Sequence, residues 1–221
     1  MSRIIYNKFD KKLIGELPRV DFPGRIVVVL SESEANRAVD YLLSASLLGV
    51  DTETRPSFKK GFNHEVALLQ VCDDDICFLF RLNIIGMTPS IIRLLEDTTV
   101  PKVGLSLHDD IMMLHRRVQF TPGRFIDLQD LVGAFGIEDR SLQKLYANIF
   151  GMRIVKRQQL SNWEADVLND KQKRYAATDA WTCINIYREL VRLRETGDYQ
   201  LVINEEQNDI QKDIPETGEG R

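Results

Sequence analysis

The sequence predicts an α/β protein whose mixed β-sheet combines an antiparallel meander with parallel strands and is flanked by helices. Residues 65–72 and 76–80 are apolar runs of strand length, and the Asp-Asp-Asp turn between them is typical of a hairpin. The β-branched run at residues 25–30 and the run at 102–107 are each followed by a helical pattern. Alternation of strands and helices favours parallel pairing with helices on both faces of the sheet.

The first half of the chain contains the strands that would form the meander. After the strand at residues 25–30, Ser31 and Glu34 have the spacing of a capping box, so we expect a helix that runs to about residue 46. Residues 47–50 are apolar and lead directly into Asp51, which predicts a buried strand that opens the meander.

The second half is mainly helical. We expect a strand at residues 102–107, and helices at residues 89–97, 111–117, 127–135, 141–150 and 169–194. Asp127 and Ser141 stand where helix N-caps are expected. The last helix is long and amphipathic, with a buried side expected to include Ile184, Ile186 and Leu190.

Composition limits the class of protein. The chain has 221 residues, 43% of them hydrophobic, and no apolar stretch approaches the ~20 residues of a membrane helix. The N-terminus lacks the apolar region of a secretion signal. The three cysteines lack metal-ligand spacing and predict free thiols in a reducing cytoplasm. We therefore expect a cytoplasmic protein without a membrane partner.

The charge is unevenly distributed. Residues 204–221 contain six acids and two bases with few apolar residues, which predicts a disordered acidic tail. The rest of the chain balances 27 acids with 27 bases, so the net charge of −4 does not exclude a polyanionic partner. The expected organisation is an N-terminal arm at 1–24 with a short helix near 11–17, one main domain at 25–203, and the tail.

Two carboxylates follow the predicted strand at residues 47–50. Side chains alternate along a strand, so Asp51 and Glu53 are expected to point to the same face. Two like charges buried together are costly unless a cation lies between them. Hard divalent cations prefer carboxylate oxygens, so the pair indicates a metal site if more acids converge there.

Further acids occur at the ends of other elements. Asp109 and Asp110 follow the strand at residues 102–107 at the start of a helix, where one is expected to cap the helix and the other to face the site. Tyr175 and Asp179 have the i, i+4 spacing that places both on one helical face.

Asp51-x-Glu53, Asp110 and Tyr175-x-x-x-Asp179 together resemble the three motifs of the DEDD superfamily of 3′–5′ exonucleases, in its tyrosine branch. This group includes ribonuclease D and the exonuclease domain of the Werner-syndrome helicase. Lys102-Val103-Gly104, Ser161-Asn162-Trp163 and the residues around Tyr175 extend the resemblance, which spans about residues 25–195. Alignment on residues 102–104 favours Asp110 as the ligand, with Asp109 as the alternative. Arg174 occupies the position where the histidine branch has its histidine.

The resemblance implies a ribonuclease-H-like fold and a two-metal mechanism with Mg²⁺ or Mn²⁺ as the two divalent cofactors. Asp51 would bridge both metals, Glu53 and Asp179 would hold the metal on the side of the nucleophile, and Asp110 would act on the other through waters. Tyr175 would orient the attacking water. The expected partner is a nucleic acid with a free 3′ end, with DNA slightly favoured over RNA, and the expected products are nucleoside 5′-monophosphates. No protein partner is inferred.

Phosphate contacts must come from residues outside the acid cluster. The candidates are two basic pairs in loops, Lys59 with Lys60 and Lys156 with Arg157. The alternative function is a non-catalytic module that binds nucleic acid or protein on the same fold. A degenerate copy would be expected to have lost acids, whereas here the four acids and the tyrosine are all present.

Overall fold

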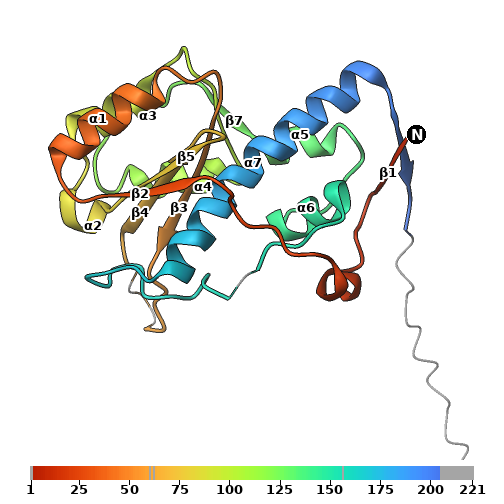
Figure 1. Ribbon diagram of the computed structural model, residues 1–221, viewed down its shortest axis with the longest axis horizontal. Helices are drawn as coiled ribbons and strands as arrows, with labels where there is room; N and C mark the ends of the chain where they lie inside the picture. The colour runs from red at the N-terminus through yellow and green to blue at the C-terminus, as the bar shows by residue number, and fades with distance from the viewer. Residues whose placement is uncertain (1, 60, 62, 156, 205–221) are drawn as a thin grey trace, which may run out of the picture.

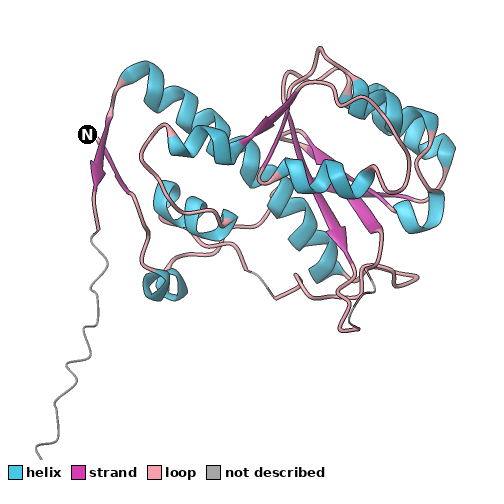
Figure 2. Cartoon of the chain, turned by 180° about the vertical axis from the view of Figure 1, so that it is seen from behind, coloured by secondary structure: helices cyan, strands magenta, loops and turns pink. Residues whose placement is uncertain are grey.

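The computed structural model describes residues 2–59, 61, 63–155 and 157–204, and these residues form a six-stranded sheet with helices on both faces (Figures 1 and 2). The strands are β1 (Arg3–Tyr6), β2 (Arg25–Val29), β3 (Leu48–Thr54), β4 (Val66–Cys72), β5 (Ile76–Phe80), β6 (Lys102–Gly104), β7 (Phe125–Asp127) and β8 (Tyr199–Val202). The helices are η1 (Lys11–Glu16, a 3₁₀ helix), α1 (Glu32–Leu42), α2 (Leu82–Ile85), α3 (Pro89–Glu96), α4 (Leu107–Leu114), α5 (Leu128–Gly133), α6 (Leu142–Phe150) and α7 (Asp170–Thr196).

The strand order of the large sheet is β2-β5-β4-β3-β6-β7. Strands β3, β4 and β5 pair antiparallel, whereas β2 joins β5, β6 joins β3 and β7 joins β6 in parallel. The predicted mixed sheet is therefore confirmed. Strand β7 was not predicted, because its three residues are too few to show a period.

Two apolar cores lie on the two faces of the sheet. One core joins the sheet to α5, α6 and α7, and the other joins it to α1 and α3. Figure 1 shows α7 crossing one face while α1 and α3 cover the other. Helix α7 has Asn169 as its N-cap in a complete capping box with Gln172, close to the predicted start.

Gly49 allows α7 to lie directly against β3. A Cβ atom at this position would be 2.1 Å from the backbone oxygen of Ala180, so any larger residue would push the helix away. Gly49 shares its strand face with Asp51 and Glu53, because side chains alternate. The contact therefore aligns both carboxylates with the N-terminal half of α7.

The two ends of the described chain meet in a second sheet. Strand β1, in the predicted arm, pairs in parallel with β8, which follows α7. Ile5 is fully buried in this contact, and the backbone amide of Asn204 donates to Asn7 Oδ1 at 2.7 Å. The remainder of the predicted tail, residues 205–221, lies outside the described residues.

Three predicted boundaries are wrong. Helix α1 ends at Leu42 rather than near residue 46, and the strand at 102–107 ends at Gly104. Helix α4 begins at Leu107, not at residue 111, and its N-cap is Ser106. Neither Asp109 nor Asp110 caps the helix, because both lie inside its first turn.

Two expectations from composition can be compared with the structure. Cys72, Cys77 and Cys183 are buried free thiols, as expected. Within the described residues, no helix combines the length and hydropathy needed to cross a bilayer.

Candidate active site

Three carboxylates converge where β3 passes the N-terminal half of α7. One oxygen each from Asp51, Glu53 and Asp179 lies within 4.8 Å of the others. Glu53 and Asp179 are each only 8% exposed, and Asp51 is partly exposed. The alternation of strand β3 thus delivers two of the acids, and the close approach at Gly49 brings the third from α7.

The electrostatics of this cluster favour a cation. Burial raises the pKa of Asp51 well above its ordinary value, and the charges of Asp110 and Asp179 raise it further. Burial also raises the pKa of Glu53, and the charges of Asp51 and Asp179 raise it further. Carboxylates held this close repel one another once ionised, and a dication placed between them removes that cost. The donor set consists of carboxylate oxygens, which fits a hard divalent ion.

Gln70 holds Asp51 in place and was not predicted from the sequence. It lies opposite Asp51 in the β3–β4 ladder, and its Nε2 donates to Asp51 Oδ2 at 3.1 Å. The side chain is completely buried. A glutamine in the middle of an apolar strand was the available signal, because a buried amide needs a polar partner.

Asp110, rather than Asp109, is the acid of α4 that contacts β3 and whose charge acts on Asp51. Its Oδ1 accepts a hydrogen bond from the hydroxyl of Thr52, the residue between Asp51 and Glu53. Burial raises the pKa of Asp110 to about 6, and the charges of Asp109 and Asp127 act in the same direction. Asp110 lies outside the group of three carboxylates, yet its charge raises the pKa of Asp51. Asp109 is exposed on the same turn.

Asp127 fixes the start of α4 and thereby the position of Asp110. Its carboxylate accepts from the amides of Ser106 at 3.0 Å and Leu107 at 2.7 Å, and it also caps α5 through the amide of Gln129 at 2.9 Å. Ser106 has a φ of 62°, in the left-handed region that non-glycine residues rarely adopt. The side-chain Nε2 of Gln129 donates to the Ser106 hydroxyl at 2.6 Å, which helps to hold this strained turn.

Tyr175 borders the cluster from α7. Its side chain forms a hydrogen bond with Asp179. Burial raises the pKa of Tyr175, and the charges of Asp179 and Glu53 raise it further. The hydroxyl therefore keeps its proton and acts as a hydrogen-bond donor. The fully buried Trp163 packs against the tyrosine ring with 6.1 Å between centroids.

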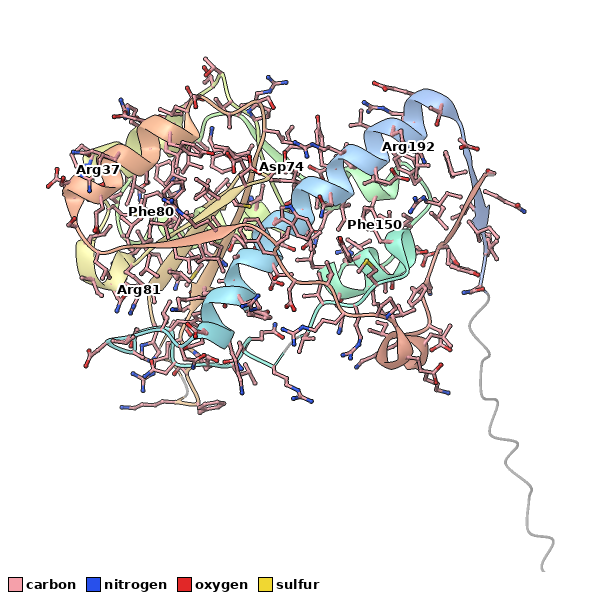
Figure 3. All side chains as sticks on the ribbon, in the orientation of Figure 1. Arg37, Asp74, Phe80, Arg81, Phe150 and Arg192 are labelled. Atoms are coloured by element: carbon pink, nitrogen blue, oxygen red, sulfur yellow. The ribbon has the colours of Figure 1, made fainter. Side chains whose placement is uncertain are left out.

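The segment that carries Trp163 is tied to the sheet and to α7. The buried guanidinium of Arg81, which follows β5 (Figure 3), donates to the backbone oxygens of Ala165 and Asp166. The Gln172 amide donates to the backbone oxygen of Asn162 at 3.2 Å. These contacts explain how Trp163 is held beneath Tyr175.

The four predicted phosphate contacts are only partly described. Lys60 and Lys156 lie outside the described residues, and Lys59 is exposed in the loop after β3. Arg157 is exposed and lines a cleft that Tyr175 also borders. Arg157 therefore lies on the same cleft as Tyr175, a residue of the predicted site, whereas Lys59 does not line that cleft.

Comparisons with known proteins show the family to which the chain belongs. The model of the 3′-5′ exonuclease family matches residues 26–194. The mouse bifunctional 3′-5′ exonuclease/ATP-dependent helicase WRN is 29% identical over 206 residues, which cover 89% of this chain but 15% of that protein. A 3′-5′ exonuclease of Arabidopsis thaliana is 30% identical over 189 residues, covering 78% of this chain and 66% of that protein.

Solved structures show the same fold at lower identity. The Nibbler EXO domain of Aedes aegypti has a TM-score of 0.70 at 22% identity and covers 77% of this chain and 89% of that chain. Escherichia coli RNase D has a TM-score of 0.69 at 18% identity, with 77% of this chain and 45% of that chain covered. These similarities confirm the ribonuclease-H-like fold, and the family match over residues 26–194 shows that the chain belongs to the 3′-5′ exonuclease family of the DEDD superfamily.

Proposed function

We propose that this protein is a metal-dependent 3′–5′ exonuclease that releases nucleoside 5′-monophosphates from the 3′ ends of nucleic acids. The observation that carries the proposal is the convergence of Asp51, Glu53 and Asp179 within 4.8 Å, bordered by Tyr175. The presence of a tyrosine at this position supports the tyrosine branch of the superfamily. The buried carboxylates fit Mg²⁺ or Mn²⁺, for which oxygen donors are the preferred ligands.

In this proposal Asp51, Glu53 and Asp179 would hold the cations directly, and Asp110 would contribute through waters. Two divalent ions, when bound, make a water more acidic and stabilise the attacking and leaving oxygens. The described residues support this by their positions: Gln70 orients Asp51, and the hydroxyl of Thr52 orients Asp110. Such partners of metal ligands restrict the carboxylate orientation before any ion arrives.

Tyr175 is proposed to orient the attacking water. Because burial and the neighbouring carboxylates raise its pKa, the phenol remains protonated and is unsuited to act as a general base. A protonated hydroxyl held by Asp179 on one side and by the packing of Trp163 on the other is a fixed hydrogen-bond group. Fixed groups of this kind accelerate reactions by positioning rather than by proton transfer.

We favour DNA slightly over RNA as the substrate. The similarity to the exonuclease–helicase WRN at 29% identity and to the DNA polymerase I of Aquifex aeolicus at 28% identity supports this preference. A Trypanosoma brucei RNase D solved in complex with RNA U12 has a similar fold, with a TM-score of 0.68 at 21% identity. Sugar discrimination depends on a few contacts to the 2′ position.

The test is degradation of matched single-stranded DNA and RNA oligonucleotides carrying a 5′ label, with Mg²⁺ or Mn²⁺. We expect a ladder of products that shorten from the 3′ end, nucleoside 5′-monophosphates in the released fraction, and faster degradation of DNA. Faster degradation of RNA would reverse the substrate assignment. Binding of either oligonucleotide without any cleavage in either metal would instead support the non-catalytic module.

A further inference from the structure

A basic cleft of about 340 Å³ lies beside the acid cluster and shares Tyr175 with it. Three parts of the chain form its walls: the arm before β2, the segment after α6, and the first turns of α7. In Figure 1 the arm passes in front of α7 and continues beside α6. The cleft is therefore assembled from segments that are far apart in the sequence.

The lining of this cleft is strongly positive. Among the described residues that line it, Arg19, Arg153, Arg157 and Lys171 contribute four cations and Asp21 contributes one carboxylate. Asp21 pairs with Arg19 at 2.6 Å. The cleft thus carries three positive charges in excess in a chain with a net charge of −4. Like charges that share a concave surface repel one another and attract an anion.

The backbone fixes two of these cations side by side. Arg19 and Arg153 form a parallel β-bridge, in which the amide of Val20 donates to the Arg153 oxygen at 3.0 Å and the amide of Arg153 donates to the Pro18 oxygen at 2.9 Å. Arg153 Nε also donates to the Leu17 oxygen at 2.8 Å. The backbone of this wall is consequently set by the fold, while the side chains of Arg19, Arg157 and Lys171 are exposed to solvent.

We propose that the basic cleft binds the internucleotide phosphates that lie next to the scissile phosphate on the 5′ side of the substrate strand. The inference rests on the proposed function, because the 3′ end of that strand would lie at Asp51, Glu53 and Asp179. A strand that leaves this cluster past Tyr175 enters the cleft directly, since the tyrosine borders both. Arginine and lysine contacts to the phosphate backbone are independent of sequence, as an exonuclease that degrades strands of any sequence requires.

The same chemistry could bind a phosphate monoester, such as a released nucleoside 5′-monophosphate, instead of the strand. Only binding of the strand depends on the length of the oligonucleotide. A dinucleotide without a terminal phosphate has one internucleotide phosphate, which is the scissile one, so it cannot reach the cleft with another. A hexanucleotide supplies several more phosphates. Substrate length therefore separates strand binding from monoester binding.

The test compares the wild type with the double variant Arg157→Gln/Lys171→Gln and with the control Lys12→Gln/Arg194→Gln. All four side chains are exposed, and the control removes one lysine and one arginine that do not line the cleft. Binding of fluorescent single-stranded hexanucleotide is measured by anisotropy in excess chelator over a salt series. Binding in chelator does not depend on cleavage, so it remains informative even if the protein proves inactive.

Each lost phosphate contact lowers the salt slope of single-strand binding by about 0.7, so the cleft variant should lose about 1.4. When the salt concentration rises from 50 to 200 mM, the affinity of the cleft variant for the hexanucleotide should therefore fall by a factor about seven-fold smaller than that of the wild type. With Mn²⁺ present, the ratio of kcat/KM for hexanucleotide over dinucleotide should fall in the cleft variant, mainly through KM. The control variant should keep the wild-type slope and ratio.

Three outcomes overturn the proposal. The first is a cleft variant that still cleaves and keeps both the wild-type salt slope and the wild-type ratio of kcat/KM for hexanucleotide over dinucleotide. This result would leave the proposed exonuclease function intact. The second is an equal loss in the control variant, which would show a general charge effect. The third is saturable binding of inorganic phosphate or nucleoside 5′-monophosphate that disappears in the cleft variant with no change in hexanucleotide binding, which would assign the cleft to a monoester.

Discussion

Replacing Asp110 with asparagine should stabilise the metal-free protein at neutral and alkaline pH. Burial raises the pKa of this carboxyl from 3.8 to about 6, with smaller effects of Asp109 and Asp127. A group whose pKa is higher in the folded state than in the unfolded state stabilises the protein when the pH is below the pKa of the unfolded state. This contribution is lost as the pH rises through the pKa of the folded state. The ionised side chain of Asp110 therefore destabilises the folded state above pH 6.

The size of the effect follows from the two pKa values. A difference of about 2 corresponds to about 3 kcal/mol at pH 8. For a chain of this length, 1 kcal/mol changes the melting temperature by about 2–4 °C, so Asp110→Asn should raise it by about 6–12 °C at pH 8. At pH 4 the gain should nearly vanish. The asparagine oxygen can still accept the hydrogen bond of the Thr52 hydroxyl, so the contact survives.

The assay is thermal unfolding in chelator at pH 4 and pH 8, with Asp109→Asn as the matched control. Asp109 lies on the same first turn of α4 but is exposed, so both variants lose a similar interaction with the helix N-terminus, about 0.3–1 kcal/mol. Added Mn²⁺ should raise the melting temperature of the wild type more than that of Asp110→Asn. Stabilisation at pH 8 by Asp109→Asn, and not by Asp110→Asn, would refute the reasoning and reassign the second acid.

Further changes test other parts of the structure. Tyr175→Phe should lower kcat by roughly 10²–10⁴ and leave substrate binding unchanged, because only a positioning hydroxyl is lost; single-turnover cleavage measures this, and a wild-type rate would make Tyr175 a packing residue. Gln70→Leu should weaken Mn²⁺ binding about 10–100-fold by freeing Asp51, which calorimetry can measure, and unchanged affinity would contradict the positioning role. Ile5→Ala should cost about 2–5 kcal/mol in chemical unfolding, because Ile5 is fully buried between the chain ends, and a loss below 1 kcal/mol would show that β1 is dispensable.

Much of the site was predictable because its motifs are local. The alternation of a strand places Asp51 and Glu53 on one face, and the helical period places Tyr175 and Asp179 on one face. Each pattern needs only a few consecutive residues. The mixed sheet was predictable for the same reason, because a hairpin and alternating strands and helices leave local traces.

The remaining features depend on contacts between distant segments. The position of Gln70 opposite Asp51 follows from the register between β3 and β4, which no local sequence pattern predicts. Helix α4 starts early because Asp127 binds the amides of Ser106 and Leu107 from 20 residues or more along the chain. The propensity of Ser106 gives no indication of its left-handed conformation.

The pairing of β1 with β8 joins the two ends of the chain, beyond the reach of any local pattern. Each strand has four residues, and residues 1–24 mix charged and isolated apolar side chains. Burial of Ile5 is the tertiary effect that stabilises this pairing. The limits of the predicted domain, at residues 25 and 203, remain a prediction.

The most direct test of the central claim is single-turnover cleavage of a 5′-labelled oligonucleotide by the wild type and Asp51→Asn, each with Mn²⁺ and with excess chelator. The acid cluster predicts stepwise shortening from the 3′ end by the wild type with Mn²⁺ alone. Asp51→Asn should be inactive, yet at least as stable as the metal-free wild type, because it removes a charge that its neighbours repel. Robust cleavage by folded Asp51→Asn, or by the wild type in chelator, would contradict the assignment of these carboxylates as the metal-binding catalytic centre.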